Sequence, residues 1–223
     1  MQFLYHKDAS KDTLTISGDE YKYLFKVRRV KKGSFVELRN LEDNKIYFYK
    51  VLSITKKDAT LSLYSYEQKE VLPKRSLTIG WCIIDPKEIE KALPSLNEIG
   101  VEKIVFIKCA YSQANFKIKK ERLHKILINS SEQCGRSNIV KIEFSNSIKE
   151  FLDKYPNSYL LDFSNNHIDN YKDDIETIII GCEGGISEDE RKLFDKEKII
   201  GFNSNLILKS QSASIATASK ILL

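Results

Sequence analysis

The sequence predicts an α/β protein in two parts, a small β-barrel-like domain followed by a larger domain with a mostly parallel sheet. Three observations support this prediction. Apolar and polar residues alternate in short runs over residues 1–70. From residue 74 onward, strand-like runs alternate with helix-like runs. The segment between them, residues 68–76, is charged and contains Pro73. We therefore predict domains at 1–70 and 74–223.

The N-terminal domain is expected to consist of short strands, because alternation with a period of two is typical of half-buried strands. The expected strands are residues 2–5, 13–17, 34–39, 45–55 and 59–66. A short helix from Asp19 to about Val27 is expected to interrupt them. A small barrel is the simplest fold for such a chain.

The C-terminal domain is expected to repeat strand–helix units, which imply a mostly parallel sheet covered on both faces. Asp85 as N-cap, Pro86 at the first helical position and Gly100 at the end mark its first helix. Strands are expected at 76–84, 103–108, 139–144, 159–163, 177–181 and 198–202. Helices are expected at 87–99, 117–134, 147–155, 187–195 and 211–223.

The composition excludes several classes of protein. No apolar run approaches the about 18 residues of a membrane span, and the start, MQFLYHKDASKD, lacks the apolar region of a signal peptide. We therefore expect a cytoplasmic protein. The histidines have no metal-ligand spacing, and the cysteines form no CxxC pair. We expect no metal and reduced, structural cysteines, which are Cys82, Cys109, Cys134 and Cys182.

One segment concentrates the basic charge. The chain carries a net charge of +5, and residues 22–32 contain no acid. Their basic residues are Lys22, Lys26, Arg28, Arg29, Lys31 and Lys32. With Tyr23 and Phe25 between them, these residues are candidates for following a nucleic-acid backbone. The alternative interpretation is a solvated helix end.

The stretch TIIIGCEGGISEDE, residues 177–190, carries the strongest chemical signal. A strand runs into a glycine-rich turn, and Ser187 with Glu190 has the spacing of a helix capping box. Glycines leave peptide groups open to a ligand at the carboxyl end of the strand, where open α/β sheets bind ligands. A nucleotide-like ligand fits this place, and a tight connection without a ligand is the alternative. The stretch matches neither a P-loop nor a dinucleotide fingerprint.

This stretch resembles the IGPEGGxSxxE element of the bacterial ribosomal RNA uridine-N3 methyltransferase family. Further pieces follow in the family's order across both expected domains. They are YLFKVRRVKKGSFVEL at 23–38, LNEIGVEKIVFI at 96–107, SEQCGRSNIVKI at 131–142 and NLILKSQSASIATA at 205–218. Each motif alone is weakly specific for the family, but the occurrence of all of them in the family's order is specific.

The resemblance implies a PUA-like β-barrel followed by a SPOUT-class methyltransferase domain whose last segment forms a trefoil knot. It implies S-adenosylmethionine as cofactor, 16S ribosomal RNA of the small subunit as substrate, and a homodimer. The basic segment then becomes the candidate RNA-binding region. The implied donor pocket consists of Leu161, Gly181, Glu183, Gly184, Gly185, Gly201, Asn203, Leu206, Ile207 and Leu208.

Methylation of uridine N3 requires loss of the imide proton, so a base or stabilisation of the developing anion is needed. Arg136 is the candidate for orienting the uracil or its phosphate. Glu183 is the candidate for holding the cationic end of the donor or, less favoured, for taking the proton. Lys209 stands at a family arginine and is the candidate for a charge near the RNA. The alternatives are a helix-capping arginine, a helix-dipole carboxylate and a surface lysine.

Departures from the family pattern cluster near the expected active site. Cys182 replaces a proline, Lys209 an arginine and Gln211 a glutamate, and Ala114 stands where an arginine is typical. These departures leave two alternatives open. One is an RNA-binding module that has lost catalysis, and the other is a related methyltransferase acting on another RNA base.

Overall fold

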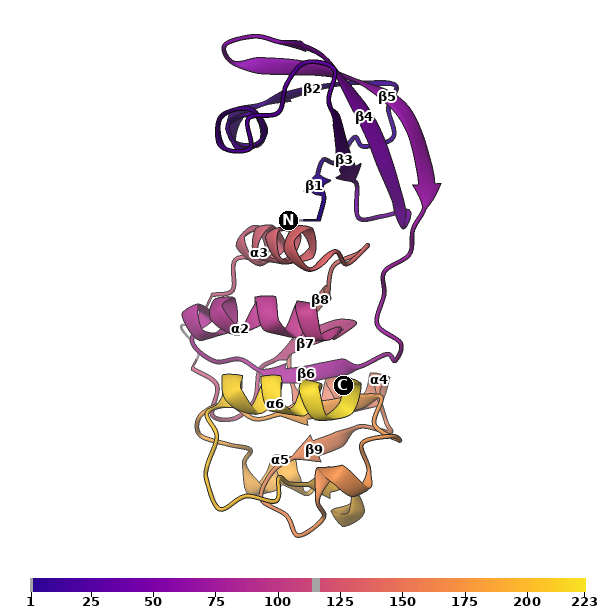
Figure 1. The fold of residues 1–223 in the computed structure, drawn as a ribbon. Helices are drawn as coiled ribbons and strands as arrows, with labels where there is room; N and C mark the ends of the chain where they lie inside the picture. Colours follow the sequence, from indigo (N-terminus) through magenta and orange to yellow (C-terminus); the bar gives the residue numbers. More distant parts are fainter. Residues whose placement is uncertain (1, 114–116) are drawn as a thin grey trace. The chain divides into compact units, whose positions relative to one another are not determined.

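The computed structural model describes residues 2–113 and 117–223 (Figure 1). It divides into two compact units. The first comprises the residues up to Leu72 together with Ile128–Ile139, and the second comprises Pro73–Leu127 and Val140–Leu223. The predicted limits assigned Ile128–Ile139 to the C-terminal domain. Which segments fold independently stays a prediction.

The first unit is a twisted, mostly antiparallel sheet in the order β1-β3-β4-β5-β2. The one exception among the described pairings is β1, which runs parallel to β3. The predicted strands and the predicted short helix are confirmed. The elements are β1 (Leu4–Tyr5), β2 (Thr13–Ser17), α1 (Gly18–Tyr21), the π-helix η1 (Lys22–Val27), β3 (Phe35–Arg39), β4 (Lys45–Ile54) and β5 (Asp58–Gln68).

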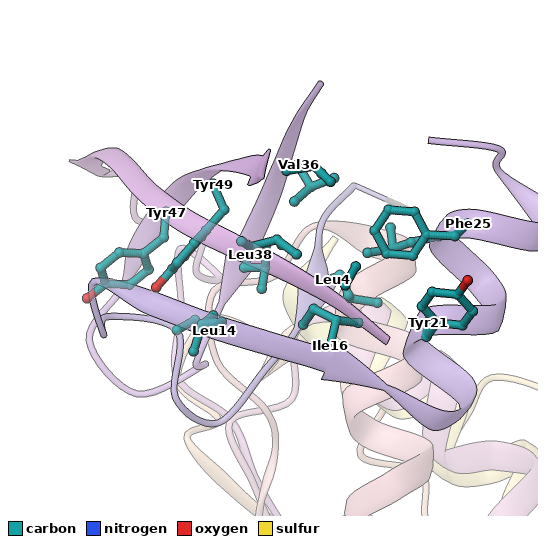
Figure 2. Close-up of a cluster of buried hydrophobic side chains, with 14 residues drawn as sticks. Leu4, Leu14, Ile16, Tyr21, Phe25, Val36, Leu38, Tyr47 and Tyr49 are labelled. Atoms are coloured by element: carbon teal, nitrogen blue, oxygen red, sulfur yellow. The ribbon is translucent and has the colours of Figure 1, made fainter. Parts of the chain in front are cut away.

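The core of this unit lies on one face of the sheet, because alternate residues of each strand point inward. Val36 and Leu38 of β3 are buried beside Tyr47 and Tyr49 of β4 (Figure 2). Tyr21 and Phe25 of the helical segment close one end of this cluster, with their ring centroids 5.1 Å apart. The helix therefore presents its apolar side to the sheet, and its lysines remain exposed.

The second unit contains a parallel sheet in the order β11-β9-β10-β6-β7-β8. Its strands are β6 (Thr78–Cys82), β7 (Lys103–Ile107), β8 (Lys141–Ser145), β9 (Tyr159–Leu161), β10 (Thr177–Ile180) and β11 (Ile199–Ile200). Its helices are α2 (Pro86–Ile99), α4 (Ile148–Lys154), η2 (Ile168–Asn170), α5 (Glu188–Arg191), η3 (Lys196–Lys198) and α6 (Ser210–Leu222), and α3 (Lys120–Cys134) begins in it.

Helices cover both faces of the central strand β6, as predicted for a parallel sheet. Every residue of β6 is buried. A Cβ atom on Gly80 would lie 2.9 Å from Phe151 of α4. The next residue, Trp81, points to the opposite face and donates from Nε1 to Ser210 Oγ of α6 at 2.9 Å. Glycine at position 80 thus permits close packing of α4.

The predicted ends of α2 are confirmed. Asp85 accepts a hydrogen bond from the Lys87 N–H, Pro86 occupies the first helical position, and Gly100 ends the helix with φ of 111°. α5 is shorter than the predicted helix at 187–195. After Arg191 the N–H groups of Leu193 and Phe194 form i→i−3 hydrogen bonds, so the α-helix ends there. The side chain of Phe194 is buried. None of the described helices has the length and apolar character needed to cross a membrane.

Candidate functional site

The loops after β9, β10 and β11 lie at one edge of the parallel sheet, since these strands are neighbours and run in the same direction. Leu161, the last residue of β9, pairs with Ile180 on one side and Ile200 on the other. The structure therefore brings Leu161, the turn after Ile180 and the segment after Ile200 to one place. Ligands bind at this edge in open α/β sheets.

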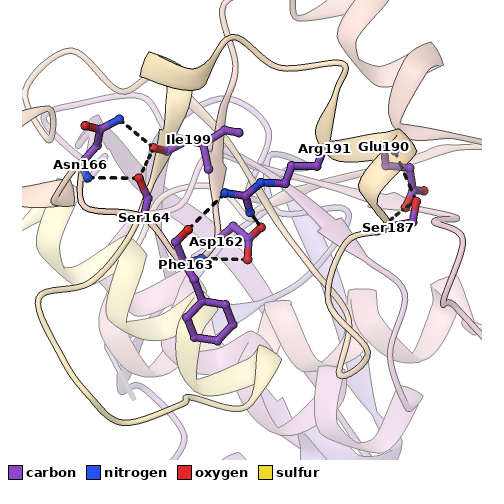
Figure 3. Close-up of polar contacts among 8 residues, drawn as sticks. All are labelled: Asp162, Phe163, Ser164, Asn166, Ser187, Glu190, Arg191 and Ile199. Carbon is purple, nitrogen blue, oxygen red and sulfur yellow. Dashed lines mark hydrogen bonds and ion pairs between the residues drawn. The ribbon is translucent and has the colours of Figure 1, made fainter.

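The glycine turn after β10 folds back on itself. The N–H of Gly185 donates to the carbonyl of Cys182 at 2.9 Å, and Gly185 has φ of 77°, a region that favours glycine. Glu183 and Gly184 are exposed at the tip of the turn. The predicted capping box follows directly: Ser187 accepts from the Glu190 N–H, and Glu190 accepts from the Ser187 N–H (Figure 3).

The segment after β11 is fixed by hydrogen bonds at its start, and its middle residues are exposed. Gly201 is buried, donates its N–H to Asn166 O at 2.8 Å and accepts from the Ile168 N–H at 2.9 Å. A Cβ atom here would lie 2.9 Å from the carbonyl oxygens of Asp162 and Ser164. Further along, Leu206 is 78% exposed and Ile207 is 79% exposed. Apolar side chains this exposed offer a surface that a partly apolar ligand can cover.

α6 joins this segment to the glycine turn. Ser210 donates from Oγ to Gly181 O at 2.6 Å while accepting from the Trp81 indole. Lys209 precedes it and is exposed. Gln211 donates to Glu88 at 3.1 Å, and its buried Oε1 lacks a hydrogen-bond partner within the described part of the chain. An acceptor oxygen of this kind suits a ligand that carries N–H or O–H groups.

A second polar group ties the loop after β9 to α5. Arg191 forms an ion pair with Asp162 and donates to Phe163 O at 3.2 Å (Figure 3). Ser164 donates to Ile199 O at 2.8 Å, which links the same loop to β11. No sequence motif identifies these residues, although the position of Asp162 at the carboxyl end of its strand is a signal. Their contacts show that they support the loops of the site.

Three cysteines that are far apart in the sequence, Cys82, Cys109 and Cys182, meet at the glycine turn. The sulfurs of Cys109 and Cys182 lie 3.6 Å apart, and Ser112 Oγ lies 3.1 Å from Cys109 Sγ. Hydrogen bonds with Cys182 and Cys82 lower the pKa of the Cys109 thiol, and the same contact with Cys109 raises the pKa of Cys182. All the cysteines are free, as expected.

Arg136 lies in the first unit, whereas the glycine turn lies in the second. It is buried, and its Nε donates to Asn138 Oδ1 at 2.6 Å. The neighbouring Glu132 accepts hydrogen bonds from Tyr5 N at its side chain and from Gln2 N at its backbone, each at 2.7 Å. These contacts give the SEQCGR motif a structural role within the first unit. A catalytic role for Arg136 stays a prediction.

The basic segment lies on the surface of the first unit. Lys22, Lys26, Arg28, Arg29, Lys31 and Lys32 are all exposed. Lys22 pairs with Asp19 at 2.9 Å, and Lys26 lies 5.7 Å from the centre of the Tyr21 ring.

Ala114 lies outside the described residues. Among these residues there is no group of three or more His, Cys, Asp or Glu side chains able to hold a metal ion.

Comparison with known proteins places these features in a family. A model described as the RNA methyltransferase domain matches residues 71–222, and one described as the RNA methyltransferase PUA domain matches residues 16–64. The ribosomal RNA small subunit methyltransferase E of Helicobacter pylori (strain ATCC 700392 / 26695) is 41% identical over 222 residues, which cover 98% of each protein. The chain belongs to the ribosomal RNA small subunit methyltransferase E family.

Solved structures agree with this membership. A predicted RNA methyltransferase from Thermotoga maritima is 25% identical, with a TM-score of 0.77 over 100% of this chain and 97% of that one. A ribosomal RNA small subunit methyltransferase E from Neisseria gonorrhoeae, solved with S-adenosylmethionine, is 18% identical, with a TM-score of 0.80 over 98% and 95%. The predicted fold class, a PUA-like domain followed by an α/β methyltransferase domain of the SPOUT class, is confirmed. The trefoil knot stays a prediction.

Proposed function

We propose that the chain is an S-adenosylmethionine-dependent methyltransferase that methylates N3 of a uridine in 16S ribosomal RNA. The observation that carries the proposal is 41% identity to a ribosomal RNA small subunit methyltransferase E, which extends over 98% of both chains. The geometry adds support, because the glycine turn and the segment after β11 meet at the ligand-binding edge of the parallel sheet.

The residues at this edge fit the proposed donor, which supplies an electrophilic methyl group on a positively charged sulfur. Leu206, Ile207 and Leu208 offer exposed apolar surface for an adenine ring. Gly181–Gly185, Gly201 and Asn203, with Leu161 beside them, complete the proposed pocket. The exposed carboxylate of Glu183 is the proposed partner of the donor's cationic end.

The acceptor nitrogen must lose its proton before it attacks, so the developing uracil anion needs nearby positive charge. We propose that Lys209, exposed at the start of α6, supplies this charge beside the pocket. Arg136 is proposed to orient the uracil or its phosphate. A target uridine that is stacked or paired must first be extruded.

We also infer a cytoplasmic homodimer with a trefoil knot in its C-terminal region, acting on the small ribosomal subunit. Exposed apolar side chains in the second unit, Leu193 and Leu223 among them, support an interface between copies. Sedimentation equilibrium tests the dimer. A monomer at micromolar concentration would contradict this part of the proposal without affecting the reaction.

The decisive experiment measures transfer of labelled methyl from S-adenosylmethionine to small ribosomal subunits purified from cells that lack this protein. We expect the label in N3-methyluridine after digestion to nucleosides. Label in another nucleoside would show that the enzyme methylates a different base. Absence of transfer, despite binding to the subunits, would leave an RNA-binding protein without catalysis.

A further inference from the structure

The outer face of the first sheet carries an exposed aromatic pair. Inward-facing Val36 is buried, whereas its neighbour Phe35 points outward and is 51% exposed. Tyr64 of β5 is 70% exposed. The two ring centroids lie 4.9 Å apart at an interplanar angle of 65°. Isolated exposed apolar residues are common on proteins, but two exposed rings in mutual contact form a platform for another flat group.

Lysines surround this pair. Lys50 of β4 is the cross-strand partner of Phe35, and it is exposed because Tyr49 and Val51 on either side point into the core. The turn with Lys31 and Lys32 lies against the same part of β4, since the Gly33 N–H donates to Val51 O at 2.8 Å. In the described part of the chain these three lysines form no ion pair.

An aromatic surface bordered by lysines that form no ion pair matches the chemistry of single-stranded RNA. Bases that are not held in a duplex stack on aromatic rings, and the phosphates between them are bound by lysine. A duplex hides the faces of its bases and offers mainly its backbone. Lysine-rich borders also disfavour a protein partner of similar basic charge.

We propose that Phe35 and Tyr64 stack bases of a single-stranded RNA segment, with Lys31, Lys32 and Lys50 binding its phosphates. The inference rests on the proposed function only in taking RNA as the partner. It assigns the first unit a preference for unpaired RNA and extends its RNA surface from the basic segment onto β3, β4 and β5.

The test uses the full chain and a fluorescently labelled oligouridine, with an RNA hairpin of equal length for comparison. The double variant Phe35→Ala with Tyr64→Ala should bind oligouridine at least about tenfold more weakly, as expected for lost stacking. Its salt dependence should stay unchanged, because no phosphate contact is removed. Lys31→Ala with Lys50→Ala should instead reduce the salt slope, by about 0.7 per lysine.

Two variants control for folding and for simple loss of surface. The exchange Phe35→Tyr with Tyr64→Phe keeps both rings and should restore binding. Tyr66→Ala removes a tyrosine of the same strand that is 58% exposed and packs instead near Tyr47, with centroids 5.8 Å apart. It should leave binding unchanged.

The proposal is overturned if the alanine double variant binds oligouridine as the unmodified chain does. It is also overturned if hairpin binding falls equally, if the exchange variant fails to restore binding, or if the unmodified chain does not bind oligouridine. Loss of binding to ribosomal subunits alone, with oligouridine binding kept, would point to a protein partner at this face. Donor binding and methyl transfer are measured separately and report on the proposed function. Failure of the RNA-stacking proposal can therefore be distinguished from failure of the proposed function.

Discussion

Backbone packing at Gly201 shows how one residue position can control the site. The chain passes so close to the loop after β9 that a Cβ atom would lie 2.9 Å from the carbonyl oxygens of Asp162 and Ser164. Backbone oxygens cannot rotate away as the end of a flexible side chain can. The space for a side chain at this position is therefore absent, whichever residue replaces glycine.

We expect Gly201→Ala to weaken S-adenosylmethionine binding by roughly tenfold or more, equivalent to about 1.4 kcal/mol. The added methyl group should displace the segment that carries the proposed pocket residues. Isothermal titration calorimetry measures the affinity, and Asn205→Ala, at an exposed position of the same segment, is the control. If Gly201→Ala binds the donor as tightly as the unmodified chain does, this segment does not form part of the pocket.

The buried carboxyl of Glu132 predicts a pH-dependent stability. Burial raises its pKa above the ordinary value of 4.5, although the hydrogen bond from the Tyr5 N–H opposes this rise. The native state therefore binds the proton more tightly than the unfolded state. The stabilisation is fully present below the unfolded pKa and is lost as the pH rises through the folded pKa.

Glu132→Gln removes this titration. The free energy of unfolding of the variant, relative to the unmodified chain, should therefore increase as the pH rises from about 4 to 7. Urea denaturation at several pH values measures the difference. A difference that is constant with pH would show that Glu132 has the same pKa in both states.

At the scale of secondary-structure elements, the start of α6 connects the sheet core to the site. Ser210 Oγ accepts from the buried Trp81 indole and donates to Gly181 O, so one hydroxyl fixes the helix relative to the glycine turn. Removing it leaves a buried indole N–H without an acceptor.

We expect Ser210→Ala to lower the free energy of unfolding by about 1–3 kcal/mol and to weaken donor binding in parallel. Ser212→Ala, at an exposed position of the same helix, should change neither quantity. Denaturation curves and donor titrations measure both. A destabilised Ser210→Ala variant that retains full donor affinity would separate α6 from the pocket.

Elements were predictable from sequence where their signals are local. Asp85, Pro86 and Gly100 define α2 within 16 residues, and Ser187 with Glu190 defines the start of α5. The contacts of Asp162 with Arg191, of Ser210 with Gly181 and among the cysteines join distant segments. The spacing of apolar residues along the sequence does not reveal such pairings, because they depend on the order of the strands in the sheet. The same reason explains why Ile128–Ile139 was assigned to the C-terminal domain, since its partners are Gln2 and Tyr5.

At the scale of the whole molecule, the proposed basic RNA-binding segment and the proposed donor pocket fall in different units. The exposed basic segment belongs to the first unit, whereas the proposed donor pocket belongs to the second. Changes in one should therefore leave the other's binding intact. This separation makes RNA affinity and donor affinity independent measurements.

We expect Arg28→Ala with Arg29→Ala to weaken binding to small-subunit RNA and to reduce its salt slope by about 0.7–0.9 per arginine. Both side chains are exposed, so the fold should tolerate the change. Arg29 has φ of 55°, which alanine tolerates no worse than arginine. Donor affinity should stay the same, because these residues lie outside the second unit. Binding measured over a range of salt concentrations decides the matter: an unchanged slope would mean that both arginines are solvated and contact no phosphate, whereas a reduced slope with normal donor affinity would assign them to the RNA.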